Sequence, residues 1–148
     1  MDGKRTSKQI ADLISAECLA VRVRMLNRVV TSVYDDELRP LGMTIAQLNQ
    51  LVVIRKLGKA SARQVVRALQ MDASTVSRNL ERMRQEGWIV EEPAEDARSR
   101  MLSVTAKGAA RLKDVLPAWR RAQSRARRIL GEPAASAFAA TAAQLWSR

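Results

Sequence analysis

The sequence of 148 residues contains 26 lysines and arginines against 15 aspartates and glutamates, which gives a formal net charge of +11. It contains no histidine and one cysteine, which excludes histidine-ligated zinc, serine–histidine–aspartate and cysteine–histidine catalysis, and an internal disulfide. The length is that of a single domain, and the excess of basic residues favours a polyanionic partner such as nucleic acid.

The composition predicts a mainly helical fold, because alanine, leucine, valine and arginine abound while aromatic residues make up 3%. No stretch approaches the roughly 18 apolar residues of a membrane helix, and the polar amino terminus leads into no apolar signal segment. We therefore expect no membrane partner and a cytoplasmic location, where a reducing environment suits a single cysteine.

One long amino-terminal helix is predicted from about residue 8 to residue 38, where the chain has neither proline nor glycine. Two apolar stripes at three-to-four-residue spacing run along it. One stripe would pack within its own domain, and the other would pack against a partner subunit or line a ligand cavity. The first stripe comprises Leu19, Val23, Leu26, Val30 and Val33, and the second comprises Ile14, Cys18, Val21, Met25 and Val29.

Three capped helices are predicted after a break at Pro40 and Gly42. Thr44 and Ser61 each begin a capping box, and Asp72 is a good N-cap for the third helix. A helix of about eight residues, a turn of about three and a second capped helix are typical of a helix-turn-helix, whose second helix enters a major groove. The expected core positions of the first two helices are Ile45, Leu48, Leu51, Val52, Ile54, Val65, Val66 and Leu69.

The third of these helices, from residue 73 to about residue 86, is predicted to present a short, hydroxylated and basic face. Serine and threonine approach phosphates and base edges closely, asparagine pairs with adenine and arginine pairs with guanine. The positive end of the helix dipole adds to the attraction of phosphate. The expected buried stripe is Ala73, Val76, Leu80 and either Met83 or the stem of Arg84, which leaves Ser74, Thr75, Ser77, Arg78, Asn79 and Arg82 exposed.

A two-stranded wing is predicted after Gly87, which ends the third helix in a left-handed conformation. The strands are expected at residues 88–90 and 101–104, joined by a ten-residue loop. Trp88 is expected to pack in the core beneath the wing.

Two further helices are predicted at the carboxyl end. The first runs from residue 106 to about residue 130, is strongly basic at its far end, and contains Pro117, which predicts a kink or a break into two helices. The second follows Gly131 and is too short and apolar to be stable alone, so we expect it to dock against the first helix of a partner. Its apolar positions are Phe138, Ala142, Leu145 and Trp146.

Several segments together resemble a known family. They are residues 72–80 (DASTVSRNL), Met83, residues 86–89 (EGWI), residues 96–99 (DARS) and residues 102–108 (LSVTAKG). In this order and spacing they resemble the MarR (multiple-antibiotic-resistance regulator) family of bacterial transcription factors, over roughly residues 43–113 and with compatible helices on both sides.

The resemblance implies one domain over residues 1–148, with a winged helix-turn-helix at about 44–104. Dimerisation helices at about 8–38 and 106–148 would intertwine in a homodimer. It also implies that Arg98, oriented by Asp96, reaches into the minor groove of the DNA. The negative electrostatic potential of that groove is enhanced where the groove is narrow, which attracts an arginine. The expected DNA-contacting residues are Ser61, Ser74, Thr75, Ser77, Arg78, Asn79, Arg82, Asp96, Arg98 and Arg100.

The expected function is that of a homodimeric, sequence-specific regulator that binds a pseudo-palindromic operator in double-stranded DNA. It would repress, or less often activate, nearby genes and respond to a small ligand whose site the sequence does not identify. The wing loop carries Glu91, Glu92 and Glu95, which repel phosphate, so the helix is expected to contribute more than the wing.

Two alternatives stay open. Some family members sense organic hydroperoxides through a cysteine in the first helix, and Cys18 lies in a comparable region. The chain would otherwise be a basic nucleic-acid-binding module without sequence preference, with affinity governed by salt. Nothing marks an enzyme, a resident cofactor or a metal site.

Overall fold

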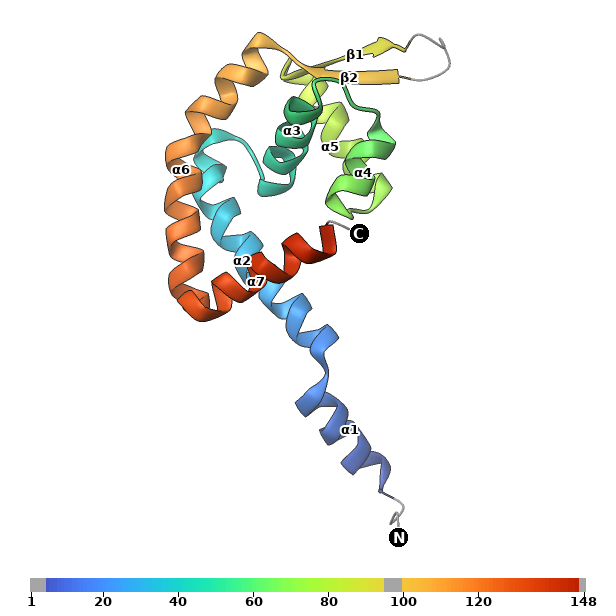
Figure 1. The fold of residues 1–148 in the computed structure, drawn as a ribbon, viewed down its shortest axis with the longest axis vertical. Helices are drawn as coiled ribbons and strands as arrows, with labels where there is room; N and C mark the ends of the chain where they lie inside the picture. Colours follow the sequence, from blue (N-terminus) through green and yellow to red (C-terminus); the bar gives the residue numbers. More distant parts are fainter. Residues whose placement is uncertain (1–4, 95–99, 147–148) are drawn as a thin grey trace. The chain divides into compact units, whose positions relative to one another are not determined.

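The computed structural model describes residues 5–94 and 100–146, which form a mainly helical fold with one two-stranded antiparallel sheet (Figure 1). The predicted fold class is confirmed. Residues 1–32 and residues 33–148 form two compact units. The elements are α1 (Ser7–Glu17), α2 (Leu19–Leu38), the 3-10 turn η1 (Arg39–Leu41), α3 (Ile45–Leu57), α4 (Ala62–Leu69), α5 (Ala73–Gln85), β1 (Ile89–Pro93), β2 (Arg100–Val104), α6 (Ala106–Leu130) and α7 (Glu132–Trp146).

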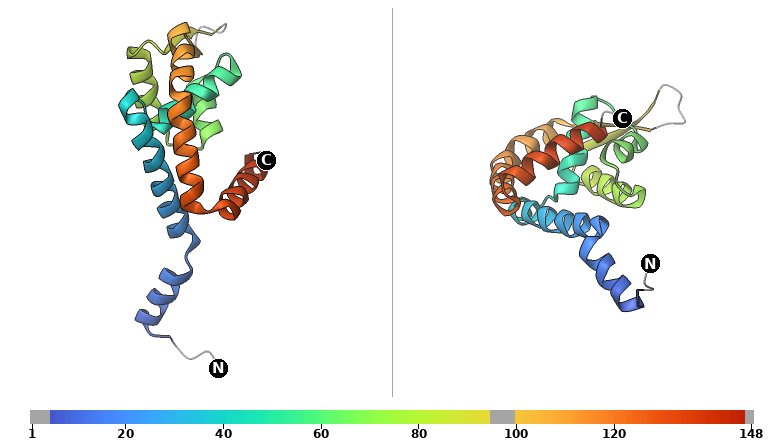
Figure 2. Two further views of the ribbon diagram at one scale, coloured as in Figure 1. Left: turned by 90° about the vertical axis from the view of Figure 1, so that its left-hand side faces the viewer. Right: turned by 60° about the horizontal axis from the view of Figure 1, so that its bottom comes forward.

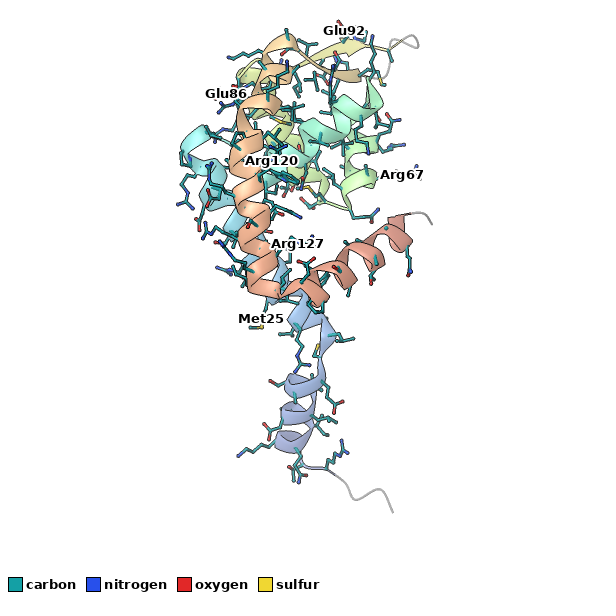
Figure 3. All side chains as sticks on the ribbon, turned by 60° about the vertical axis from the view of Figure 1, so that its left-hand side comes forward. Met25, Arg67, Glu86, Glu92, Arg120 and Arg127 are labelled. Atoms are coloured by element: carbon teal, nitrogen blue, oxygen red, sulfur yellow. The ribbon has the colours of Figure 1, made fainter. Side chains whose placement is uncertain are left out.

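The prediction of one continuous amino-terminal helix is wrong, because the chain forms two helices there. α1 ends at Glu17, Cys18 has an extended backbone (φ −64°, ψ 107°), and α2 begins at the next residue. α1 buries none of its side chains, so no packing would stabilise a helix that continued through Cys18. Intrinsic helix propensity alone stabilises a helix only weakly. Most of the two apolar stripes is exposed: 74% of Leu19 and 63% of Met25 are accessible, and Figure 3 shows Met25 projecting from α2. Val33, at the end of the first stripe, is buried.

Local side-chain caps set the starts of the next three helices, as predicted. Thr44 Oγ1 accepts a hydrogen bond of 3.2 Å from the backbone N–H of Gln47. Ser61 Oγ accepts one of 3.2 Å from the N–H of Gln64 at the start of α4. These caps satisfy amide groups that the first helical turn leaves without partners. In the turn before α5, Gln70 has a positive φ of 50°.

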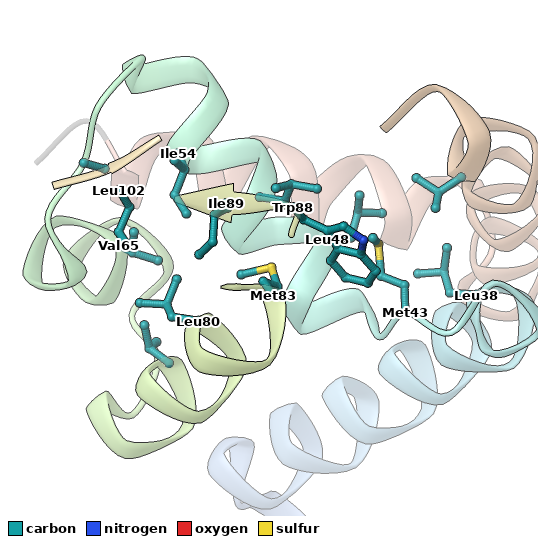
Figure 4. Packing of buried hydrophobic residues seen from close by; sticks show 14 of the residues in the cluster. Leu38, Met43, Leu48, Ile54, Val65, Leu80, Met83, Trp88, Ile89 and Leu102 are labelled. Carbon is teal, nitrogen blue, oxygen red and sulfur yellow. The ribbon is translucent and has the colours of Figure 1, made fainter. Parts of the chain in front are cut away.

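The hydrophobic core of the described residues lies between α3, α4, α5 and the sheet, and it extends to the end of α2 and to α6 (Figure 4). Met83, rather than Arg84, completes the buried side of α5. Two predicted core positions are wrong, because Val52 is 38% exposed and Ala73 lies on the surface. Val52 lies beside the buried stripe of α3, on which Ile54 is fully buried. Ala73 is the first residue of α5, one turn before the fully buried Val76, and so lies at the exposed end of its stripe.

The sheet pairs β1 with β2 in antiparallel register from Ile89 opposite Val104 to Pro93 opposite Arg100. Both strands are longer than predicted, since backbone pairing carries β1 through two glutamates of low strand propensity. The backbone of Ala60 exchanges two hydrogen bonds with Leu102, of 3.0 and 2.8 Å, which ties the start of α4 to the wing.

The base of the wing is closed by a tight contact with the first turn of α6. Thr105 Oγ1 accepts a 3.0 Å hydrogen bond from the N–H of Gly108 and donates one of 2.7 Å to the carbonyl of Gly87. A Cβ atom at Gly108 would lie 2.1 Å from the carbonyl oxygen of Trp88. Trp88 itself is buried, as predicted. A glycine is therefore required where α6 crosses the backbone of the wing.

α6 continues through Pro117 as one helix of 25 residues, so the predicted alternative of a break is wrong. In Figure 1 its ribbon is curved along its length. Val115 and Ala118 on either side of the proline are buried, and this packing offsets the cost of about 3 kcal/mol for a proline within a helix. At Gly131 the chain turns sharply into α7 (Figure 2, left).

Candidate nucleic-acid interface

The amino terminus of α5 is held by Asp72. Its Oδ2 accepts a 3.0 Å hydrogen bond from the N–H of Thr75 and another from the hydroxyl of Ser74. The Ser74 hydroxyl, followed by the Thr75 amide, holds the pKa of the Asp72 carboxyl below its usual range. The cap therefore stays ionised at neutral pH and fixes the first turn of α5.

The outer face of α5 is hydroxylated and basic, as predicted. Ser74, Ser77, Arg78 and Arg82 are exposed, while Thr75 and Asn79 are half-buried at its edge. Arg78 Nη2 lies 3.4 Å from Thr75 Oγ1, so this guanidinium extends back over the first turn. Residues three and four apart share one face of a helix, which brings these side chains together. The face suits donation to phosphate oxygens and to base edges.

Ser61 has a structural role. Its hydroxyl caps α4, and its own N–H donates a 2.8 Å hydrogen bond to Gln64 Oε1. The residue lies at the amino terminus of α4, a helix that also carries exposed cations missing from the sequence-based prediction. Arg63 and Arg67 stand four residues apart on α4, and Figure 3 shows Arg67 projecting from it. Their i, i+4 spacing is the signal that would have identified them.

The acidic strand of the wing is paired with cations. Lys59 Nζ lies 3.4 Å from a carboxylate oxygen of Glu92, and Arg100 Nε lies 3.9 Å from Glu91. The pairs reduce the repulsion of phosphate that the sequence predicted for this strand. They also engage Arg100, an expected DNA contact, within the protein. Of the other wing residues in that prediction, Asp96 and Arg98 lie outside the described residues, as does Glu95.

A cavity of about 280 Å³ lies behind the far end of α5. The carboxylate of Asp35 on its wall accepts a 2.7 Å hydrogen bond from the N–H of Ile45, which fixes the start of α3. Arg82 therefore borders both the exposed face of α5 and this cavity. The lining residues are Asp35, Arg39, Gly42, Met43, Thr44, Gln47 and Arg82.

Cys18 is a half-buried free thiol at the junction of α1 and α2. The sequence suggested Arg22 as a cation that would stabilise a thiolate there. The guanidinium of Arg22 instead donates a hydrogen bond to the carbonyl of Ala16. The Arg22 guanidinium therefore binds the backbone in this structure.

Within residues 5–94 and 100–146, no group of three or more cysteine and carboxylate side chains is placed to hold a metal ion. Among the helices of that same part, none combines the length and apolar character needed to cross a bilayer.

Comparison with known proteins agrees with this arrangement. A family model described as MarR family matches residues 41–99. The chain is 23% identical over 88 residues to YwoH of Bacillus subtilis (strain 168), an uncharacterised HTH-type transcriptional regulator. That match covers 60% of this chain and 64% of the relative.

Solved structures share the fold. A mutant of MarR from E. coli in complex with operator DNA superposes with a TM-score of 0.77 at 19% identity, covering 89% of this chain and 96% of that one. A probable transcriptional regulator from Pseudomonas aeruginosa gives 0.76 at 24% identity, covering 88% and 98%. BpsR of Bordetella bronchiseptica gives 0.73 at 19% identity, covering 88% and 95%. The capped helix-turn-helix and the first strand of the wing thus lie in a segment that matches the MarR family, and the chain shares its fold with MarR and with a probable transcriptional regulator.

Proposed function

We propose that the protein is a homodimeric, sequence-specific DNA-binding regulator that represses nearby genes and responds to a small ligand. The exposed face of α5 carries the proposal. Its hydroxyl groups lie near the amino terminus of the helix, its guanidinium groups follow along the same face, and the opposite side of the helix is buried in the core. Such a helix fits a major groove, with arginine and asparagine positioned for base edges.

The homodimer is supported by apolar side chains that the single chain leaves exposed. They include Ile14 on α1, Met25 on α2 and Phe138 on α7, each between 45% and 63% exposed. Helices with exposed apolar stripes are stabilised by packing against another helix, and a second copy supplies the same stripes. Two copies would hold two α5 helices at a fixed separation, which selects the spacing of the DNA half-sites.

Modulation by a ligand is supported by the cavity of about 280 Å³ behind α5. A molecule held there would contact Arg82, which also borders the proposed DNA face. In BpsR, which shares this fold, DNA binding is regulated by 6-hydroxynicotinic acid. By analogy, we propose that a small molecule alters the DNA affinity of this protein.

The decisive experiment is selection of bound fragments from random double-stranded DNA by the full chain. The proposal predicts a recovered motif with two inverted half-sites about one helical turn apart. Recovery of fragments without a common motif, with affinity that depends only on salt concentration, would instead identify a non-specific basic module.

A further inference from the structure

The basic end of α6 divides into two groups of arginines with different surroundings. Arg121 Nε donates a 2.9 Å hydrogen bond to Glu37, and Arg125 Nη1 donates one of 2.8 Å to the same carboxylate. These two arginines, four residues apart, therefore bind the end of α2. Arg120, Arg127 and Arg128 form the second group and make no hydrogen bond to Glu37. Arg120 and Arg127, seven residues apart, lie on a neighbouring stripe of α6.

This second group lines an open cavity of about 510 Å³ at the corner between α6 and α7. Figure 3 shows Arg120 and Arg127 on α6, the latter near this corner. The volume is within the range of small-molecule sites, about 300–1,000 Å³. The lining residues are Arg120, Gln123, Ser124, Arg127, Arg128, Gly131 and Glu132.

The charge of the cavity is not balanced by the protein. Its three arginines and one glutamate leave a formal net charge of +2. Glu132 bonds to Arg127, whereas Arg120 and Arg128 have no ion pair with any residue of the described part of the chain. The last turn of a helix favours cations, which accounts for the two arginines there. It does not account for Arg120, two turns earlier, so the cluster exceeds what helix stability requires.

The neutral lining groups add donors to the guanidinium groups. The hydroxyl of Tyr34 donates to Gln123 Oε1, which leaves the amide N–H groups of Gln123 for another acceptor. Ser124 contributes a hydroxyl to the same wall. Guanidinium groups bind phosphate oxygens through paired hydrogen bonds, and a phosphate monoester carries close to two negative charges at neutral pH.

We propose that this cavity binds a small molecule through a dianionic phosphate group. The two negative charges of such a group balance the +2 excess of the lining residues, and its oxygens match a wall made of donors. The site is separate from the cavity behind α5, with which it shares no lining residue. The proposal does not depend on DNA binding, and its test contains no DNA.

The test is calorimetric titration of the full chain with inorganic phosphate at pH 8 and constant ionic strength. Wild type should bind about one phosphate per chain with saturation. The variant Arg120→Gln/Arg128→Gln should bind at least about tenfold more weakly, and Arg55→Gln/Lys56→Gln, which removes two exposed cations from α3, should match wild type. Ser124→Asp places a carboxylate in the cavity and should abolish binding. Circular dichroism checks that each variant is folded.

Two results would overturn the proposal: the absence of saturable phosphate binding to wild type, and equal binding by the cavity variant and the α3 control. Sedimentation extends the first result, since wild type that binds no phosphate can be accompanied by dissociation of the Arg120→Gln/Arg128→Gln variant into monomers. In that case the cavity receives an acidic group of a second copy.

Discussion

Arg125, near the end of α6, donates a 2.8 Å hydrogen bond to the carboxylate of Glu37, in the last turn of α2. Arg121 binds the other oxygen at 2.9 Å, and 18% of the Glu37 side chain is exposed. The hydrogen bond from Arg125, followed by that from Arg121, holds the pKa of Glu37 below its ordinary value of 4.5. This contact joins segments that are far apart in sequence.

The first prediction concerns the pH dependence of this contact. Because the pKa of Glu37 is lowered in the folded state, its stabilising contribution is present above about pH 4.5 and is lost as the pH falls below that value. Glu37→Gln should therefore lower the melting temperature at pH 7 and approach wild type at pH 3. Thermal unfolding followed by circular dichroism measures both. Glu86→Gln, an exposed change at the end of α5, is the control. If Glu37→Gln lowers the melting temperature by the same amount at pH 7 and at pH 3, the ionised carboxylate of Glu37 does not stabilise the fold as described.

The second prediction concerns the crossing of α6 and the wing. Gly108→Ala adds a methyl group 2.1 Å from the Trp88 carbonyl oxygen, so backbone must move. The loss should be about 1–3 kcal/mol, although alanine has the higher helix propensity. Denaturant unfolding measures it, and Ala110→Ser, at an exposed position of α6, should change stability by less than about 0.5 kcal/mol. Equal midpoints for Gly108→Ala and wild type would show that the crossing is not tight.

The third prediction concerns the pairing of Lys59 with Glu92. Both side chains are more than half exposed, so Glu92→Gln should hardly change stability. It should raise affinity for DNA, because it removes a repulsive charge and releases Lys59 to contact phosphate. One added phosphate contact would steepen the dependence of log affinity on log salt by about 0.9. Fluorescence anisotropy across a salt series measures the slope. Glu86→Gln removes one negative charge at a residue that is not paired with Lys59. An equal change of DNA affinity and salt slope in the two variants would refute the specific role of the Lys59–Glu92 pair.

The fourth prediction concerns Cys18. Since the Arg22 guanidinium is directed to the Ala16 carbonyl, we expect no special activation of the thiol. Wild type and Cys18→Ser should respond alike when DNA affinity is measured during titration with an organic hydroperoxide. Loss of DNA affinity in wild type alone would establish the thiol-sensing alternative.

Features set by neighbouring residues were predicted from the sequence. The caps at Thr44, Ser61 and Asp72 and the left-handed Gly87 depend on side chains or backbone within a few positions. The exposed face of α5 was predicted for the same reason, because helical periodicity separates it from Val76 and its neighbours in the core.

Features that depend on distant contacts were missed. The break at Cys18 reflects the absence of packing around α1, and the continuity of α6 at Pro117 reflects packing against the core. Gln50 is a polar residue that the core buries completely, with its amide nitrogen 3.9 Å from the sulfur of Met71. The division of the α6 arginines is set by Glu37, which lies 88 positions from Arg125. No local pattern contains this information.

The central claim is that α5 recognises DNA sequence, and Arg78→Ala tests it most directly. Affinities for a selected operator and for a random duplex are measured at the same salt concentration. The matched control is Arg84→Ala on the same helix, whose guanidinium lies 2.8 Å from Glu81 within the protein. Arg78→Ala should lose about 1–3 kcal/mol of operator binding, roughly 5- to 150-fold, while non-specific binding survives. Arg84→Ala should leave the ratio of the two affinities unchanged. If Arg78→Ala also leaves that ratio unchanged, α5 does not recognise sequence through this residue, and the account is contradicted.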